Sequence, residues 1–267
     1  MAIESIQERS VLPNRTDPIR IVPLNVDQEL LRPAGEAERA AGAAQAKLTY
    51  RGGHLLTAVK VFTVFWGSQW TQQPLSATAG KINDFFDTIL TSQLLDQLAE
   101  YNVPGQQIGH GTRIGTATVT TPPPSTTVTD SGIQHLIQQE ISTGTLPTAD
   151  QQTLYFVYTP PGIKIVQGGG QSCQAFCGYH NDIGGQLFYA AMPYPGCQGC
   201  TGSLDAFAAL TSTSSHELCE AITDPVPGQG WYDDANGEID DICAWKTKTV
   251  AGYTVQLEWS NASGSCV

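Results

Sequence analysis

The cysteines constrain this chain more than any other feature, because all seven of them lie within the last 95 residues. Disulfides persist in extracytoplasmic proteins and are rare in the reducing cytosol. We therefore expect a secreted or cell-surface protein whose C-terminal half is stapled by three disulfides, with one thiol left over. Spacing alone does not decide which cysteines pair. The seven are Cys173, Cys177, Cys197, Cys200, Cys219, Cys243 and Cys266.

Two other interpretations of these cysteines remain open at this point. Cys173-x3-Cys177-x2-His180, followed by Cys197-x2-Cys200, has spacings that a structural zinc site tolerates. The Cys197-x-x-Cys200 pair also resembles a redox dithiol, although no neighbouring charge pattern would lower the pKa of its thiols. Compartment usage favours disulfides over both.

The charge balance excludes some partners. Among 267 residues, 25 are acidic and 13 basic, which gives a formal net charge of −12. Binding to a phosphate backbone requires clustered Lys and Arg, so nucleic acid is not an expected partner. The most apolar run, residues 55–66, is shorter than a bilayer-spanning helix and is interrupted by Lys60, so we expect no membrane span.

The N-terminal residues differ in character from the rest. Residues 1–46 contain several prolines and no sustained apolar period, which predicts an extended or partly disordered arm or pro-segment. Residues 1–20 lack the basic-then-apolar layout of a secretory signal. Export by another route, a signal outside this sequence and a protein that is not exported all remain open. Residues 47–267 are expected to form one α/β domain.

Apolar periodicity predicts alternating strands and helices in that domain. An amphipathic pattern predicts a helix over residues 82–101 and another over 133–141, capped by Thr129 or Asp130. β-branched and aromatic runs predict strands, and the alternation indicates an α/β, or mixed α+β, fold. The predicted strands cover residues 58–66, 112–120, 154–158 and 187–192.

The segment Ser215–Pro225 carries the strongest chemical signal. We expect a helix that is capped by Thr201 or Ser203 and ends near Thr223, before Pro225. His216 and Glu220 are four residues apart, so they share one helix face and can bind one metal ion.

The spacing is similar to the His-Glu-x-x-His helix of zinc peptidases. It predicts a zincin-like central sheet with packed helices, and Glu217 as the catalytic base that activates a zinc-bound water. Glu220 replaces the second histidine of that motif, and a solvated polar helix face is the alternative.

A third ligand is expected from the acidic segment 230–243. Glu238 is the first candidate and Asp241 the second. The same segment also suggests calcium bound by Asp233, Asn236, Glu238 and Asp241, or simply a solvated turn. His180, which we expect on a loop over residues 176–182, is an additional candidate ligand.

The cysteine layout, together with Cys177-Gly178-Tyr179-His180 and Thr223-Asp224-Pro225, resembles the phosphate-induced protein 1 family, also called EXORDIUM-like. The similarity covers residues 47–267. It implies an extracellular, disulfide-bonded protein without a settled biochemical activity. His-Glu at 216–217 and the acidic residues resemble a bacterial-type branch, in which Glu220, Asp224, Glu238 and Asp241 fall at motif positions. Cys219 has no counterpart in the six-cysteine layout, which implies a free buried thiol.

Two hypotheses follow from the sequence. In the first, the protein is a zinc-dependent hydrolase, an extracellular metallopeptidase whose strand 187–192 holds an extended peptide or protein substrate by main-chain pairing. In the second, it is a secreted module without catalytic activity, stabilised by calcium or zinc, which binds a partner or a glycan. The sequence indicates neither the oligomeric state nor the cleavage preference.

Overall fold

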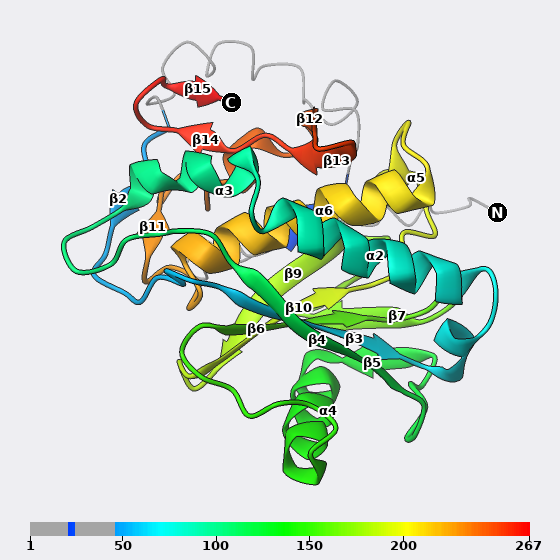
Figure 1. Ribbon diagram of the computed structural model, residues 1–267. Coiled ribbons are helices and arrows are strands. Elements are labelled where there is room, and N and C mark those ends of the chain that lie inside the picture. Colours follow the sequence, from blue (N-terminus) through cyan, green and yellow to red (C-terminus); the bar gives the residue numbers. More distant parts are fainter. Residues whose placement is uncertain (1–20, 25–45) are drawn as a thin grey trace, which may run out of the picture.

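The computed structural model describes residues 21–24 and 46–267 (Figure 1). Predictions for the remainder of the N-terminal arm lie outside the described residues. The α-helices are α2 (Leu75–Ile89), α3 (Gln93–Gln97), α4 (Asp130–Thr143), α5 (Gln198–Thr201) and α6 (Ala206–Thr223). Short 3-10 helices are η2 (Ser68–Thr71), η3 (Leu98–Tyr101) and η4 (Asp241–Cys243). The strands are β1 (Ile21–Pro23), β2 (Thr49–Tyr50), β3 (Lys60–Trp66), β4 (Thr112–Val119), β5 (Thr127–Thr129), β6 (Thr153–Tyr158), β7 (Lys164–Gln167), β8 (Gly170–Gln171), β9 (Phe176–Ile183), β10 (Leu187–Met192), β11 (Trp231–Tyr232), β12 (Thr247–Val250), β13 (Tyr253–Gln256), β14 (Trp259–Ser260) and β15 (Ser265–Cys266).

A six-stranded sheet in the order β1-β9-β10-β6-β3-β4 forms the framework. The four predicted strands are its parallel members, β3, β4, β6 and β10. β9 runs antiparallel to β10, and β1 in turn pairs antiparallel with β9. The sheet is therefore mixed: within it, β9 alone runs opposite to the other five strands, next to the edge strand β1.

Helices cover both faces of this sheet, with α2 and α6 on one face and α4 on the other (Figure 1). Successive side chains of a strand point to opposite faces. Accordingly, Phe156 and Tyr158 of β6 join the core beneath α2 and α6, whereas Tyr155 and Val157 join the core beneath α4. The mixed α+β class is confirmed by this arrangement.

α6 is enclosed on more than one side. It packs on β9 and β10 of the sheet, and also against β13, which pairs with β12 on the opposite side of the helix (Figure 1). Every residue from Ala209 to Thr223 is consequently buried. The predicted solvated polar face therefore does not exist on this helix.

Three local predictions differ from the structure. The helix predicted over 82–101 is divided, because the side chain of Ser92 accepts a hydrogen bond from Leu94 N at 3.2 Å and caps α3 as a new helix. The N-cap of α6 is Asp205, and neither Thr201 nor Ser203. Residues 176–182, predicted as a loop, belong to β9. The predicted cap of α4 by Thr129 is confirmed, with Gly132 N donating at 3.1 Å.

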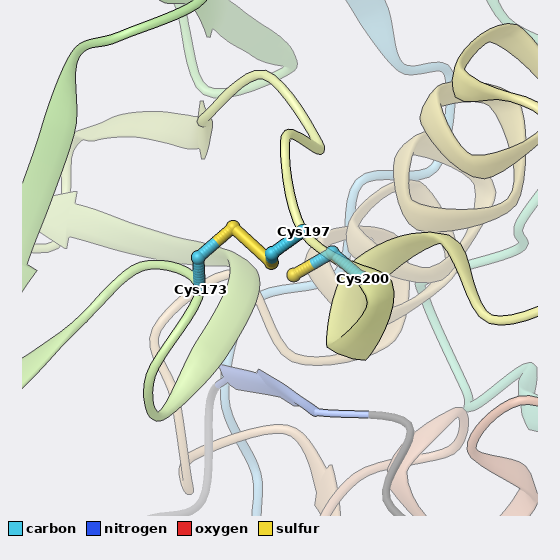
Figure 2. A group of neighbouring side chains, drawn as sticks. All are labelled: Cys173, Cys197 and Cys200. Atoms are coloured by element: carbon cyan, nitrogen blue, oxygen red, sulfur yellow. A yellow bond between two sulfur atoms is a disulfide. The ribbon is translucent and has the colours of Figure 1, made fainter.

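Three disulfides staple the C-terminal half, as predicted. They join Cys173 to Cys197, Cys177 to Cys200, and Cys243 to Cys266. Figure 2 shows the first of these bonds with the Cys200 sulfur beside it. The zinc-site interpretation of the first four cysteines is wrong because all four are oxidised. The redox interpretation of Cys197 and Cys200 is wrong too, since each pairs with a different partner. Cys219 is the free thiol, and it is buried.

No helix in the described part of the chain combines the length and apolar character needed to cross a bilayer.

Candidate metal centre

α6, the helix that carries the functional side chains, is fixed in place by hydrogen bonds of its N-cap and of two buried serines. Asp205 caps its first turn by accepting a hydrogen bond from Ala208 N at 2.8 Å. Ser214 Oγ lies 2.7 Å from the hydroxyl of Tyr158 on β6, and Ser215 Oγ accepts from Gln256 N at 2.9 Å. These contacts fix the rotation of α6 about its axis. As a result, His216, Glu217 and Glu220 occupy defined positions inside the protein.

The C-terminal end of α6 is organised by Asp224. Its carboxylate accepts hydrogen bonds from the amides of Gly228 at 2.6 Å, Gln229 at 3.0 Å and Gly230 at 2.5 Å. A side chain at position 230 is excluded, because a Cβ there would lie 2.2 Å from Thr223 O. The carboxylate oxygens of Asp224 are thus used to shape the turn after the helix. Asp224 therefore lies beside the candidate centre, but its carboxylate is already bound by backbone amides.

Side chains from three parts of the chain converge beneath that turn. β9 contributes His180, α6 contributes His216, Glu217 and Glu220, and the segment around η4 contributes Glu238 and Asp241. The histidines and glutamates are no more than 1 % exposed as side chains, and Asp241 is 5 % exposed. The predicted site residues are therefore brought together, although they are distant in sequence.

The atoms form two overlapping groups with metal-ligand geometry. The first combines His180, Glu220 and Glu238, and the second combines His216, Glu220 and Asp241. Glu220 belongs to both groups. Its Oε1 lies 2.9 Å from His216 Nε2, and its Oε2 lies 3.4 Å from His180 Nδ1.

Further short distances show how close the acidic segment lies to both histidine rings. His180 Nε2 lies 3.5 Å from Glu238 Oε1, and His216 Nε2 lies 3.9 Å from Asp241 Oδ1. Two ligands on a tetrahedral zinc with bonds near 2.0 Å are separated by roughly 3.3 Å. The separation of 3.4 Å between His180 Nδ1 and Glu220 Oε2 agrees with that value.

Unpaired polar atoms are the strongest indication that a cation belongs here. Both carboxylate oxygens of Glu217, Glu220 and Glu238 are buried without a hydrogen-bond partner, as are His180 Nδ1 and Asp241 Oδ1. Burial of unpaired carboxylates costs several kcal/mol each in real proteins. A divalent cation would satisfy them with the oxygen and nitrogen ligands that zinc accepts. The donor set therefore fits a metal ion.

The two histidines differ in how their rings are held. His180 Nε2 is 3.2 Å from the carbonyl oxygen of Asp224, to which it can donate, and this leaves Nδ1 as the free atom facing Glu217 and Glu220. Donation of the remote N–H to a backbone carbonyl is the usual arrangement of a metal-ligating histidine. His180, which the sequence offered only as an additional candidate, has the hydrogen bonding of a ligand.

His216 differs from His180 in that its hydrogen-bonded ring nitrogen, Nδ1, accepts a hydrogen bond instead of donating one. The amide nitrogen of Gln256 lies 2.7 Å from His216 Nδ1 and 2.9 Å from Asp240 O, while Gln256 Oε1 accepts from Trp245 N at 3.1 Å. These backbone partners fix the orientation of the Gln256 amide, so its nitrogen must donate to Nδ1. The remaining proton of the neutral ring is then on Nε2, which lies 2.9 Å from Glu220 Oε1 without the geometry of a hydrogen bond. His216 therefore acts on Glu220 through a close electrostatic contact.

The electrostatics separate the carboxylates. Burial raises the pKa of Glu217 to about 7, although His180 and His216 oppose this effect. For Glu220, burial also acts to raise the pKa, but the adjacent His216 and His180 outweigh it and lower the pKa to about 2. Burial and then neighbouring Glu220 raise the pKa of Glu238 well above its usual value. One carboxylate of the centre is therefore firmly ionised, and another is poised to exchange a proton near neutral pH.

Sequence reasoning missed Gln256 and Asp240. Gln256 orients His216, and both oxygens of the buried Asp240 carboxylate have no partner. Neither residue stands out in a motif, because their positions depend on β13 and η4 folding back on α6. Asp233, proposed for calcium, uses Oδ1 to accept from Ala235 N and Asn236 N within its own turn.

Comparison with known proteins returns no matching family model and no curated protein at significant similarity.

Proposed function

We propose that the protein is a metal-dependent hydrolase whose ion, zinc in the first instance, is held by His180, Glu220 and Glu238. The observation that carries this proposal is the set of buried, unpaired ligand atoms around Glu220. Compared with the sequence-based hypothesis, the ligating histidine becomes His180, and His216 becomes the residue in close electrostatic contact with Glu220. Asp241 remains the alternative ligand through its proximity to His216.

The reaction class follows from Glu217. A metal ion at this centre would polarise a carbonyl group and increase the acidity of water. Glu217 lies one residue beyond His216 on α6, and its Oε2 is 3.4 Å from His180 Nδ1. Its pKa of about 7 suits a group that accepts and returns a proton at neutral pH. This chemistry supports peptide hydrolysis, and we infer that the substrate is a peptide or protein.

The framework is consistent with a zincin-like assignment, which we propose on two grounds. The helix that carries the His-Glu-x-x-Glu spacing packs beneath the sheet, and a reversed strand, β9, lies beside it. The proposed role of strand 187–192 as a peptide holder is not available, because β10 is already paired on both sides by β6 and β9. Any extended substrate must therefore pair elsewhere.

We further propose an extracytoplasmic location and membership of the EXORDIUM-like family, bacterial-type branch. Three disulfides support the location, because such bonds persist in oxidising compartments. The family assignment rests on the cysteine and motif resemblance alone.

The proposal is tested with protein purified without chelator. Metal content is measured by elemental analysis, and hydrolysis is measured on fluorescently labelled casein and a mixed peptide library. We expect one zinc per chain, and Glu217→Gln should retain the zinc while losing at least about 100-fold in rate. Glu140→Gln, a change at another buried glutamate on α4, is the matched control and should leave both values unchanged. Unaltered hydrolysis in zinc-loaded Glu217→Gln would remove Glu217 from the mechanism.

Burial of the centre favours a second candidate function, a metal-stabilised secreted module without catalysis. The side chains of His180, His216 and Glu220 are at most 1 % exposed, which is typical of a structural ion. On this hypothesis the metal raises the unfolding temperature, and no substrate is hydrolysed by the wild type under any loading condition. A shift with calcium and none with zinc would select the calcium-stabilised form of this alternative.

A further inference from the structure

The strand β1 comes from the N-terminal arm and occupies the side of the sheet nearest to the metal centre. Its residues pair antiparallel with β9, with Ile21 opposite Tyr179, Val22 opposite Gly178, and Pro23 opposite Phe176. The other five strands of the sheet all come from residues 60–192. Without β1, the strand that carries His180 would present unpaired N–H and C=O groups along its outer edge.

β1 contacts three elements that supply the centre. Besides β9, it touches α6, which carries Glu217 and Glu220, and η4, which begins at Asp241. The segment is also anchored by a hydrogen bond, since Trp245 Nε1 donates to Pro23 O at 2.8 Å. β1 therefore closes the side on which β9, α6 and η4 meet.

Val22 is the residue of β1 that pairs with the part of β9 next to the proposed base, Glu217. It lies opposite Gly178, and directly opposite residues of an antiparallel pair point to the same face. That face is the one occupied by α6, because a Cβ on Gly178 would lie 3.0 Å from Glu217 Oε1. Val22 is 1 % exposed and packs in a cluster with Cys177 and Cys200. Val22 thus covers β9 at Gly178, the position where the Glu217 carboxylate approaches this strand.

The chemistry of the segment defines what the edge accepts. Val22, Pro23 and Leu24 are all apolar, and Leu24 lies against Gly199 of α5, where a Cβ would lie 3.2 Å from its Cδ2. Proline has no N–H to continue the ladder, which limits the pairing to a short stretch. The edge of β9 is therefore suited to a short, extended, apolar peptide strand.

We propose that residues 21–24 pair with the edge of β9 as an internal ligand and thereby close the metal centre. An extended apolar peptide opens the centre when it displaces this segment, or when it takes the place of the segment after removal. This inference deepens the proposed function and depends on it for the nature of the enclosed ion. It accounts for a centre that has hydrolase chemistry but no exposed side chain. β-Strand addition of this kind supplies affinity through main-chain hydrogen bonds and specificity through alternate side chains.

The test uses the full chain with Val22→Asp, which places a charge in the buried cluster, and Val22→Thr as the matched, similarly shaped control. Hydrogen exchange at the β9 amides reports release of the strand. Zinc release to excess EDTA reports access to the centre, and a labelled peptide of residues 18–27 reports the vacated edge. We expect Val22→Asp to exchange its β9 amides faster, to release zinc at least about 10-fold faster and to bind the peptide, with Val22→Thr close to wild type.

The inference is overturned if Val22→Asp frees the β9 amides while zinc release stays at the wild-type rate, or if the vacated edge does not bind the peptide. Should Val22→Asp fail to fold by near-ultraviolet circular dichroism, the milder Val22→Ala is measured in the same way. A chain that binds no zinc refutes the proposed function separately. In that case amide exchange and peptide binding still decide whether residues 21–24 are a displaceable ligand.

Discussion

The two faces of the central sheet are covered by helices of opposite character. α4 has an apolar stripe of Ile133, Leu136 and Ile137 against the sheet, and its other side is exposed or half-buried. α6 is buried on all sides between the sheet and β13, and carries His216, Glu217 and Glu220 inside. The first helix stabilises the fold by burying apolar surface. The second requires the rest of the molecule to keep charged groups in place, as functional sites commonly do.

The largest difference between the two helix-covered faces is expected when one histidine on each face is replaced by alanine. His180→Ala should lower zinc affinity at least about 1000-fold, since it removes a ligand and leaves buried carboxylates facing one another. His135→Ala, at an exposed position of α4, is the control and should leave zinc affinity unchanged. Competition titration with a chromophoric chelator measures both. Full zinc affinity in His180→Ala would return the ligand role to His216.

A substitution in the apolar core beneath α4 should lower the stability of the fold and leave zinc affinity almost unchanged. Leu136→Ala is expected to cost about 3 kcal/mol in the free energy of unfolding, because it leaves a cavity in a packed apolar layer. Zinc affinity should stay within about 2-fold of wild type, since the sheet separates the two cores. Urea unfolding and the same chelator titration test this. A parallel loss of metal affinity would show that the faces are coupled.

The apo protein should lose stability as pH rises from 4.5 to 7. Burial raises the pKa of Glu217 and of Glu258 to about 7 in the folded state. A raised folded pKa stabilises below the unfolded value of 4.5, and this contribution is lost as pH rises through 7. Glu220 acts in the opposite direction, but only below pH 4.5, because its folded pKa is lowered to about 2.

Thermal unfolding in EDTA across this pH range is the measurement. Added zinc should reverse the trend, since metal binding favours deprotonated ligands and strengthens with pH. An apo protein that becomes more stable from pH 4.5 to 7 would contradict the assignment of buried, uncompensated carboxylates.

The smallest expected effect concerns the helix caps, in which the two helices are alike. Thr129→Ala on α4 and Asp205→Ala before α6 should each cost about 1 kcal/mol, because each removes one acceptor from a first-turn amide. Chemical denaturation measures both losses. Equal losses in the free energy of unfolding would show that α4 and α6 are alike at their N-termini. The two helices would then differ only in what their side chains bury.

Local patterns predicted much of the framework. The four parallel strands, α4 with its Thr129 cap and the end of α6 at Thr223 follow from periodicity, capping and the position of Pro225. The break at Ser92 did not, because apolar spacing continues across it and only the cap interrupts the helix. β9 was missed since Cys177, Gly178 and His180 do not form an alternating pattern.

The candidate site was predictable only within α6. Glu220 and His216 share a helix face, so their proximity follows from spacing alone. The division of roles between His180 and His216 depends on Asp224 O and on Gln256, which reach the rings through long-range folding. Glu238 and Asp241 were identified as acidic residues after the helix, yet their placement required η4 to fold against β1 and α6.

The buried thiol of Cys219 is unreactive in the folded protein and becomes reactive when the chain unfolds. Burial raises the pKa of its thiol well above the usual value, so the folded protein contains almost no thiolate to attack its own disulfides. Once the chain unfolds at alkaline pH, that thiol ionises beside three exchangeable bonds. Heat inactivation should therefore become irreversible through disulfide scrambling, and Cys219→Ser should recover its native structure on cooling when the wild type does not.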